Sequence, residues 1–196
     1  MKSEPETNPG FPHEEVIEDL PQPIPKWVKG WMHPFELRWL YNEAVHLKGN
    51  LVPGELLEIG SFRGLSACAL GQAARLTCID TFLGGEDMGA YDSWDDFWKA
   101  MAALQLRPTV LRGTSREMLP ILKGRQFALI LVDGSHTYDN VLYDLTASWN
   151  LLSKGGALVA DDVDFTHPDV MRAVRDSHLP FKPVDLRQSK MAVVYK

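Results

Sequence analysis

The sequence is short of cysteine, of excess basic charge and of long apolar runs, and each shortage excludes a class of protein. Two cysteines, Cys68 and Cys78, make neither a disulfide framework nor a zinc site, and their apolar surroundings are typical of buried thiols. The 20 basic and 26 acidic side chains give a net charge of -6, which argues against nucleic acid or an anionic membrane as partner. No apolar stretch approaches the roughly 20 residues of a membrane helix, and the N-terminus has no apolar signal-peptide core. We therefore expect a cytoplasmic protein with neither a membrane nor a nucleic-acid partner.

The chain length and the distribution of proline predict one domain behind an N-terminal arm. A chain of 196 residues with 45% hydrophobic side chains can bury one sizeable core. Proline recurs at six positions between residues 5 and 25, where it removes backbone donors and restricts the residues before it. We expect an extended or mobile arm over 1–26 and one domain over 27–196. As an alternative, the arm packs on a neighbouring subunit or covers the active site, which would suit a homodimer.

Short apolar segments alternate with helical patterns along the domain. A helix is expected over about 35–47, followed by further helices near 64–74, 94–105, 115–123 and 138–152. Strands are expected at 56–60, 76–80, 109–113, 127–133 and 157–162, and the tail from Phe181 predicts two strands joined by a turn. The strands lack polar alternation, which indicates a parallel sheet buried on both faces. The predicted fold class is α/β, Rossmann-like and doubly wound, with a mostly parallel sheet and a C-terminal antiparallel strand pair.

A glycine-containing loop follows the first expected strand, in the run Glu58-Ile-Gly60-Ser-Phe-Arg-Gly64. Its glycines permit a tight strand-to-helix turn and a close approach by a ligand, and the amides of the next helix suit a carboxylate or phosphate. The spacing matches neither the dinucleotide-binding fingerprint nor a P-loop. Asp80 ends the second strand 22 residues after Glu58, where an acid can accept both hydroxyls of a ribose. A glycine turn before a helix is often only a turn, but the combination predicts a nucleoside-bearing ligand.

The run LEIGSFRGLSA resembles the first motif of class I S-adenosylmethionine-dependent methyltransferases. The likeness is closest to the catechol and macrocin O-methyltransferase group and to small bacterial methyltransferases with an Asp-Gly-Ser-His-Thr-Tyr motif, and it covers about residues 35–196. It implies that Glu58, Gly60 and Ser66 surround the methionine end of the cofactor, with Ser66 on its carboxylate. It also implies Asp80 on the ribose and Ser115 near the adenine. Alternatively, or in addition, Ser115 is a helix N-cap.

Three acids fall at the ends of two adjacent expected strands, namely Asp133 and the pair Asp161 and Asp162. Crowded carboxylates repel one another unless a cation neutralises them, and such oxygen ligands suit Mg²⁺ or another octahedral divalent ion. The resemblance implies the same ion site, and it places Asp133 with both the cofactor and the catalytic groups. In the alternative interpretation, Asp161 or Asp162 caps the next helix or binds solvent.

His136 is the candidate general base, because histidine titrates near neutral pH and lies three residues after Asp133. Catechol O-methyltransferases carry lysine at the corresponding position, so the resemblance does not extend to this proton transfer. As alternatives, His136 is a further metal ligand or a hydrogen-bonded residue behind the ligands. We expect divalent-metal-assisted O-methylation of a small molecule that carries a sugar or phenolic hydroxyl. The alternative functions are metal-independent methylation and a non-catalytic S-adenosylmethionine-binding module.

Aromatic residues near the expected site are candidates for the acceptor pocket. The long segment between Thr81 and Phe97 carries Tyr91 and Trp94, and long loops in compact domains are often functional. Tyr91, Trp94 and Trp98 would line the acceptor pocket. The i, i+4 spacing of Trp94 and Trp98 favours instead a place for these two residues in the core. Trp31 and His33, before the first helix, are weaker candidates for a lid.

Overall fold

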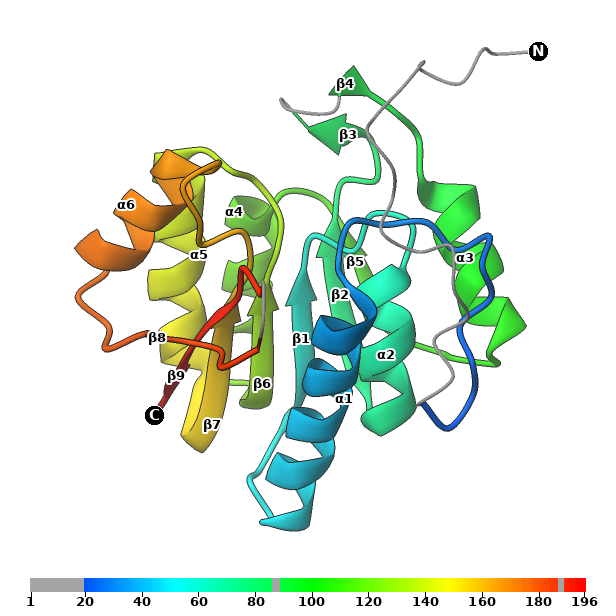
Figure 1. Ribbon diagram of the computed structural model, residues 1–196, viewed down its shortest axis with the longest axis horizontal. Helices are drawn as coiled ribbons and strands as arrows, with labels where there is room; N and C mark the ends of the chain where they lie inside the picture. The colour runs from blue at the N-terminus through cyan, green and yellow to red at the C-terminus, as the bar shows by residue number, and fades with distance from the viewer. Residues whose placement is uncertain (1–19, 86–88, 187–188) are drawn as a thin grey trace.

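A computed structural model describes residues 20–85, 89–186 and 189–196, and it shows a seven-stranded sheet between two layers of helices (Figure 1). Most of the arm predicted over 1–26 lies outside the described residues. The strands of this sheet are β1 (Glu55–Ile59), β2 (Leu76–Asp80), β5 (Thr109–Arg112), β6 (Phe127–Val132), β7 (Leu152–Ala160), β8 (Lys182–Pro183) and β9 (Ala192–Tyr195). Their order across the sheet is β5-β2-β1-β6-β7-β9-β8.

The strand order places β1 at the point where the chain changes direction across the sheet. From β1 the chain runs outward to β2 and β5, then returns to the other side of β1 to form β6 and β7, and all these neighbours are parallel. In open α/β sheets, ligands bind outside the carboxyl ends of the strands at such a switch point. β9 pairs antiparallel with β7 and with β8, so the predicted sheet with its C-terminal antiparallel pair is confirmed.

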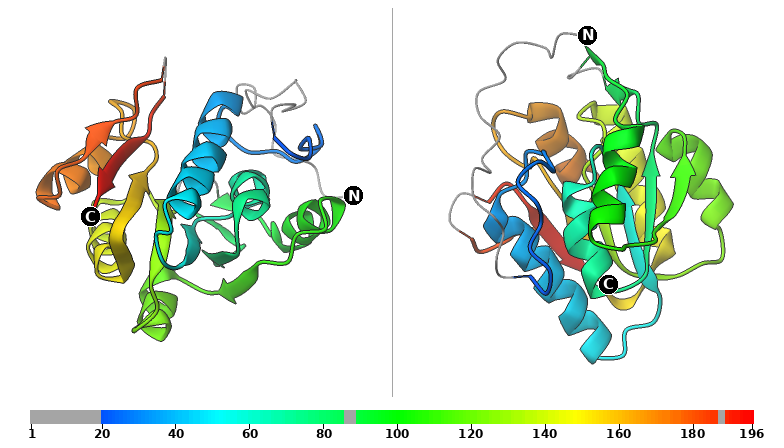
Figure 2. Two further views of the ribbon diagram at one scale, coloured as in Figure 1. Left: turned by 90° about the horizontal axis from the view of Figure 1, so that it is seen from below. Right: turned by 90° about the vertical axis from the view of Figure 1, so that its right-hand side faces the viewer.

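Helices cover both faces of the sheet, as the views in Figure 2 show. One face carries α1 (Pro34–Gly49), α2 (Leu65–Ala73) and α3 (Trp94–Ala103), while the other carries α4 (Ser115–Met118), the 3₁₀ helix η1 (Leu119–Leu122), α5 (Tyr138–Leu151) and α6 (Pro168–Asp176). Successive strand residues alternate between the two cores, so Leu56 packs with the first layer of helices and Leu57 with the second. Cys68 and Cys78 are buried free thiols, as predicted. No helix in the described part of the chain has the length and apolar character needed to cross a bilayer.

Three elements differ from the sequence-based expectation. The helix expected over 115–123 ends after one turn and continues as η1, where Pro120 lacks the amide that an α-helix would use. The segment 168–176, to which no element was assigned, forms α6 with Pro168 in its first turn and three buried apolar residues. The segment after β2 contains a short antiparallel hairpin of β3 (Gly84–Gly85) and β4 (Gly89–Ala90) before α3 begins.

Candidate functional site

The loops that carry the predicted site residues gather at the carboxyl ends of β1, β2, β5, β6 and β7, the upper edge of the sheet in Figure 1. Backbone hydrogen bonds tie these ends together: the Gly60 amide donates to the Ile79 carbonyl at 2.9 Å, and the Asp133 amide donates to the Ile59 carbonyl at 2.9 Å. The residues that follow β1, β2 and β6 are therefore held side by side.

The glycine loop, residues 60–64, connects β1 to α2 in a left-handed backbone conformation at both ends. Gly60 has φ +93° and Gly64, the N-cap of α2, has φ +88°. A Cβ at Gly60 would collide with the carbonyl of Asp133, and one at Gly64 would lie 3.1 Å from the Phe97 ring. Close approach by the backbone that follows β6 is therefore reason enough for glycine at position 60, where we expected the close approach of a ligand.

Glu58 and Ser66 are buried at the base of this loop. Burial raises the pKa of Glu58 from 4.5 to about 7. The hydrogen bond that the Ser61 hydroxyl donates to Oε2 of Glu58 lowers this pKa, but by less than burial raises it. Among the described residues, no hydrogen-bond partner reaches the Oε1 atom of Glu58. An unpartnered buried acceptor beside a helix N-terminus can receive the ammonium group of a bound ligand.

Asp80 braces the glycine loop against the segment that follows β2. Its Oδ2 accepts the Phe62 amide at 2.7 Å and its Oδ1 accepts the Phe82 amide at 2.6 Å. Because a carboxylate oxygen has two acceptor positions, each oxygen keeps one for a further donor such as a ribose hydroxyl.

Ser115 begins α4 after β5, and the alternative interpretation that it is the N-cap of that helix is wrong. The N-cap is Thr114, whose hydroxyl accepts the Glu117 amide at 3.3 Å while the Glu117 carboxylate accepts the Thr114 amide at 3.0 Å. Thr-Ser-Arg-Glu is the capping-box pattern, which identifies Thr114 from sequence. The side chain of Ser115 instead hydrogen-bonds to Asp144 of α5. Burial raises the pKa of Asp144 to about 6, and the hydrogen bond from Ser115 limits that rise.

The carboxylates of Asp133, Asp161 and Asp162, called the acidic cluster below, offer oxygens within 4.8 Å of one another. Burial and the neighbouring Asp162 raise the pKa of Asp161 to about 7. Shielding from water and the charges of the other two acids raise the pKa of Asp133 as well. No described residue supplies a hydrogen bond to Asp161 Oδ1. The juxtaposition expected from the strand ends is present, and its unpartnered oxygen is an electrostatic cost that a cation would relieve.

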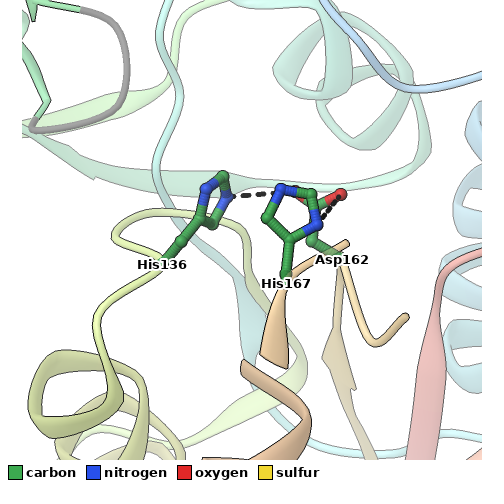
Figure 3. A group of neighbouring side chains, drawn as sticks. All are labelled: His136, Asp162 and His167. Carbon is green, nitrogen blue, oxygen red and sulfur yellow. Dashed lines mark ion pairs between the residues drawn. The ribbon is translucent and has the colours of Figure 1, made fainter. Parts of the chain in front are cut away.

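Asp162 has three basic neighbours, two of which are shown in Figure 3. His136 Nε2 lies 3.0 Å from Asp162 Oδ2 and His167 Nδ1 lies 3.6 Å from Oδ1, while the Lys190 ammonium also contacts Oδ1. Burial would raise the pKa of Asp162, but hydrogen bonds from His136 and Lys190 hold it well below its usual range. Asp162 is therefore ionised and shared among these groups, and it does not cap α6, which begins at Pro168.

Sequence reasoning missed His167, Lys190 and the residue that places Lys190, which is Glu36 of α1. Glu36 is fully buried, and its Oε1 accepts the Ser189 hydroxyl and the Lys190 amide, both at 3.0 Å. Its Oε2 accepts the His33 amide at 2.9 Å. A buried Glu at the start of a helix reads in sequence as a capping residue, and nothing in the sequence indicates its contact with residues more than 150 positions away.

The aromatic residues proposed as pocket walls divide into two groups. Tyr91 lies against Phe62 of the glycine loop at 5.8 Å between ring centroids, and Trp31 stacks on the same ring at 5.1 Å. Trp94 packs instead against the core below α3, and Trp98, 36% exposed, contacts it edge to face. Tyr91 and Trp31 therefore lie beside the glycine loop, whereas Trp94 belongs to the packing of α3.

A protein family described as a methyltransferase domain matches residues 57–163, from β1 to the loop after β7. The chain belongs to this methyltransferase family. It is a methyltransferase of the class I, S-adenosylmethionine-dependent type that its sequence resembles, and the glycine loop and the acidic cluster both lie within the matched segment.

Solved structures share the fold of this methyltransferase at low sequence identity. The O-methyltransferase NovP is 18% identical over 85% of this chain and 81% of its own, with a TM-score of 0.74. CalS11, described as a TDP-rhamnose 3'-O-methyltransferase, is 19% identical over 82% and 77%, with a TM-score of 0.63. The O-methyltransferase TomG from Streptomyces achromogenes, solved in complex with SAM, is 19% identical over 84% and 81%, with a TM-score of 0.62. Among curated protein sequences the chain has no match.

Proposed function

We propose that the domain over 27–196 transfers the methyl group of S-adenosylmethionine to a hydroxyl oxygen of a small molecule, a sugar or a phenol, with the help of a divalent cation. The observation that carries this proposal is the convergence of Asp133, Asp161 and Asp162 at the sheet edge beside the glycine loop. The solved proteins of similar fold, NovP, CalS11 and TomG, support oxygen as the methylated atom, since each is described as an O-methyltransferase.

The donor set around the glycine loop fits the proposed cofactor. Glu58 has a buried, unpartnered oxygen for the ammonium group, and the first turn of α2 with Ser66 offers donors for the carboxylate. Asp80 keeps acceptor positions for the ribose, and Ser115, after β5, lies at the same sheet edge for the adenine. In this proposal Gly60 and Asp133 shape the wall between the cofactor and the acceptor.

The acidic cluster fits a hard divalent ion such as Mg²⁺. At ligand distances of about 2.0–2.1 Å, octahedral geometry places ligand oxygens about 3 to 4 Å apart, which agrees with carboxylate oxygens within 4.8 Å of one another. When bound, such an ion lowers the pKa of the acceptor hydroxyl and holds its oxygen in place. Asp162 would enter this coordination only after Lys190 leaves its carboxylate, because the two are in direct contact.

His136 is the proposed proton acceptor. Asp162 orients its ring through Nε2 at 3.0 Å and would stabilise the imidazolium that forms, as the acid of a catalytic triad does. S-adenosylmethionine supplies the methyl group, and the acceptor oxygen forms its bond to carbon as the carbon–sulfur bond breaks. The protein must also align the acceptor oxygen with the methyl group of S-adenosylmethionine. Tyr91 and Trp31, beside the glycine loop, would contribute to this alignment.

Metal-independent methylation is the second candidate function, and the contact of Lys190 with Asp162 favours it. An ammonium that already lies on the Asp162 carboxylate can take the place of a metal in balancing the charge of that acid. In that case Asp161 and Asp162 hold Lys190 and His136 in place.

Calorimetry with S-adenosylmethionine, in Mg²⁺ and in chelator, together with methyl transfer to a panel of sugar and phenol acceptors, tests the proposal. We expect cofactor binding in both conditions, and turnover in Mg²⁺ that falls at least about a hundredfold in chelator or in Asp161→Asn. Turnover that ignores both changes would establish the metal-independent reaction. Absence of cofactor binding would overturn the proposal as a whole.

A further inference from the structure

Two imidazoles from different loops face one carboxylate at the edge of the acidic cluster (Figure 3). His136 lies in the loop between β6 and α5, and His167 precedes α6, so they belong to separate connections of the fold. Their rings are 4.5 Å apart between centroids, and both direct a nitrogen toward Asp162. One ligand atom from each of the three residues lies within 4.8 Å of the others.

The separations are short enough for the three residues to share a single small ion. A tetrahedral ion with ligands at about 2.0–2.1 Å holds them about 3.3 Å apart. His136 Nε2 lies 3.0 Å from Asp162 Oδ2, and His167 Nδ1 lies 3.6 Å from Oδ1, the other oxygen of the same carboxylate.

The surroundings favour a cation. Asp161, which is only 7% exposed, has a carboxylate oxygen within 4.8 Å of one from Asp162, and no described residue supplies a hydrogen bond to its Oδ1. His167 Nδ1 also lies 3.3 Å from the Asp164 carboxylate and 3.0 Å from the Thr166 hydroxyl. The only basic side chain described in contact with Asp162 besides the two histidines is Lys190, on Oδ1, which leaves Oδ2 facing His136.

We propose that His136, Asp162 and His167 form a binding site, here called the imidazole site, for a borderline divalent ion of the Zn²⁺ and Co²⁺ class. Imidazole nitrogen is the ligand that separates this class from Mg²⁺, which takes oxygen ligands and keeps most of its water. Three protein ligands leave a fourth position for water or another ligand. The imidazole site shares Asp162 with the acidic cluster, so the two ions compete for one carboxylate.

One consequence of the imidazole site rests on the proposed function. An ion on His136 Nε2 removes the imidazole from its place on Asp162, and a coordinated imidazole is a poorer proton acceptor. A borderline ion would therefore inhibit methyl transfer that Mg²⁺ supports. Binding at the imidazole site does not depend on the reaction, so it can be tested on the full chain without any acceptor.

Titration of the metal-free protein with Co²⁺, followed by its visible absorption and then by displacement with Zn²⁺, tests the proposal. We expect one equivalent of Co²⁺ to give the intense bands of low-coordinate cobalt with nitrogen ligands, and Zn²⁺ to abolish them. His167→Ala and His136→Gln should each remove the bands and weaken Zn²⁺ binding at least about tenfold, because loss of even an outer partner of a metal ligand costs 10–100-fold. His46→Ala, on the exposed part of α1, is the matched control and should change neither.

Two results would overturn the imidazole site: wild-type protein without these bands at millimolar Co²⁺, or bands that survive in both histidine variants. Unfolding temperatures in chelator show whether each variant is folded, and either variant suffices when the other is not. Asp161→Asn separates this proposal from the proposed function. It should impair Mg²⁺-dependent turnover and leave the cobalt bands at the same wavelengths, because Asp161 adds negative charge near the imidazole site but supplies no ligand atom to it.

Discussion

The Lys190 ammonium lies on Oδ1 of Asp162, a carboxylate that the acidic cluster would also offer to a divalent ion. We expect Lys190→Met to lower the free energy of unfolding of the metal-free protein by about 2 kcal/mol, because the mostly buried Asp162 carboxylate loses the ammonium in contact with it. The same change should raise affinity for a divalent ion by about tenfold or more, since the ion no longer competes with an ammonium. Thermal unfolding in chelator and in Mg²⁺, with metal binding by calorimetry, measures both effects.

Lys123→Met is the matched control for this prediction, because Lys123 is exposed in the turn before β6. It should change neither stability nor metal affinity. Equal metal affinity in the wild type and in Lys190→Met would show that Lys190 and the ion do not share Asp162.

The raised pKa of Glu58 predicts that this residue's contribution to the free energy of unfolding falls as pH rises. Its pKa is 4.5 when unperturbed and about 7 in the folded protein, so the folded state binds the proton more tightly. The resulting stability is fully present below pH 4.5 and is lost as pH rises to about 7, at a cost of about 3 kcal/mol. Glu58→Gln should therefore gain stability relative to the wild type between pH 5 and pH 8 in urea unfolding of the cofactor-free protein.

Glu117→Gln provides the comparison for Glu58→Gln. Glu117 is an exposed acid whose pKa is lowered by its hydrogen bonds with Thr114, so its neutralisation should bring no such gain at pH 8. A Glu58→Gln variant whose stability relative to the wild type is independent of pH would show that Glu58 is not protonated preferentially in the folded state.

Glu36 should matter for stability and for the placement of Lys190. Glu36→Ala leaves the Ser189 hydroxyl and the Lys190 and His33 amides without their acceptor, which should cost about 2 kcal/mol in urea unfolding. Glu36→Gln keeps one of the two acceptor oxygens, so its stability should lie between that of the wild type and that of Glu36→Ala. If Glu36→Ala unfolds at the wild-type urea concentration, these hydrogen bonds do not hold the tail against α1.

The strand ends were predictable from sequence because each buried strand is a short apolar run that stops at a polar residue. Once the strands are taken as parallel, Asp80, Asp133 and Asp161 must share one edge of the sheet. The surroundings of Asp162 were not predictable in this way. His167 lies before a helix with only three buried apolar residues, and Lys190 lies beyond it in the tail. Their contacts depend on tertiary packing, which Glu36 fixes from the other end of the chain.

His136 is tested by a substitution that keeps its size and removes its basicity. His136→Gln should leave the dissociation constant for S-adenosylmethionine unchanged, because the imidazole contacts Asp162 and His167 at the acidic cluster. Turnover should fall about 10²- to 10⁴-fold, the usual contribution of a positioned base. Single-turnover methyl transfer at saturating cofactor measures this loss without interference from binding. His46→Gln, on the exposed part of α1, should retain full activity. Unchanged turnover in His136→Gln would remove His136 from the proton transfer.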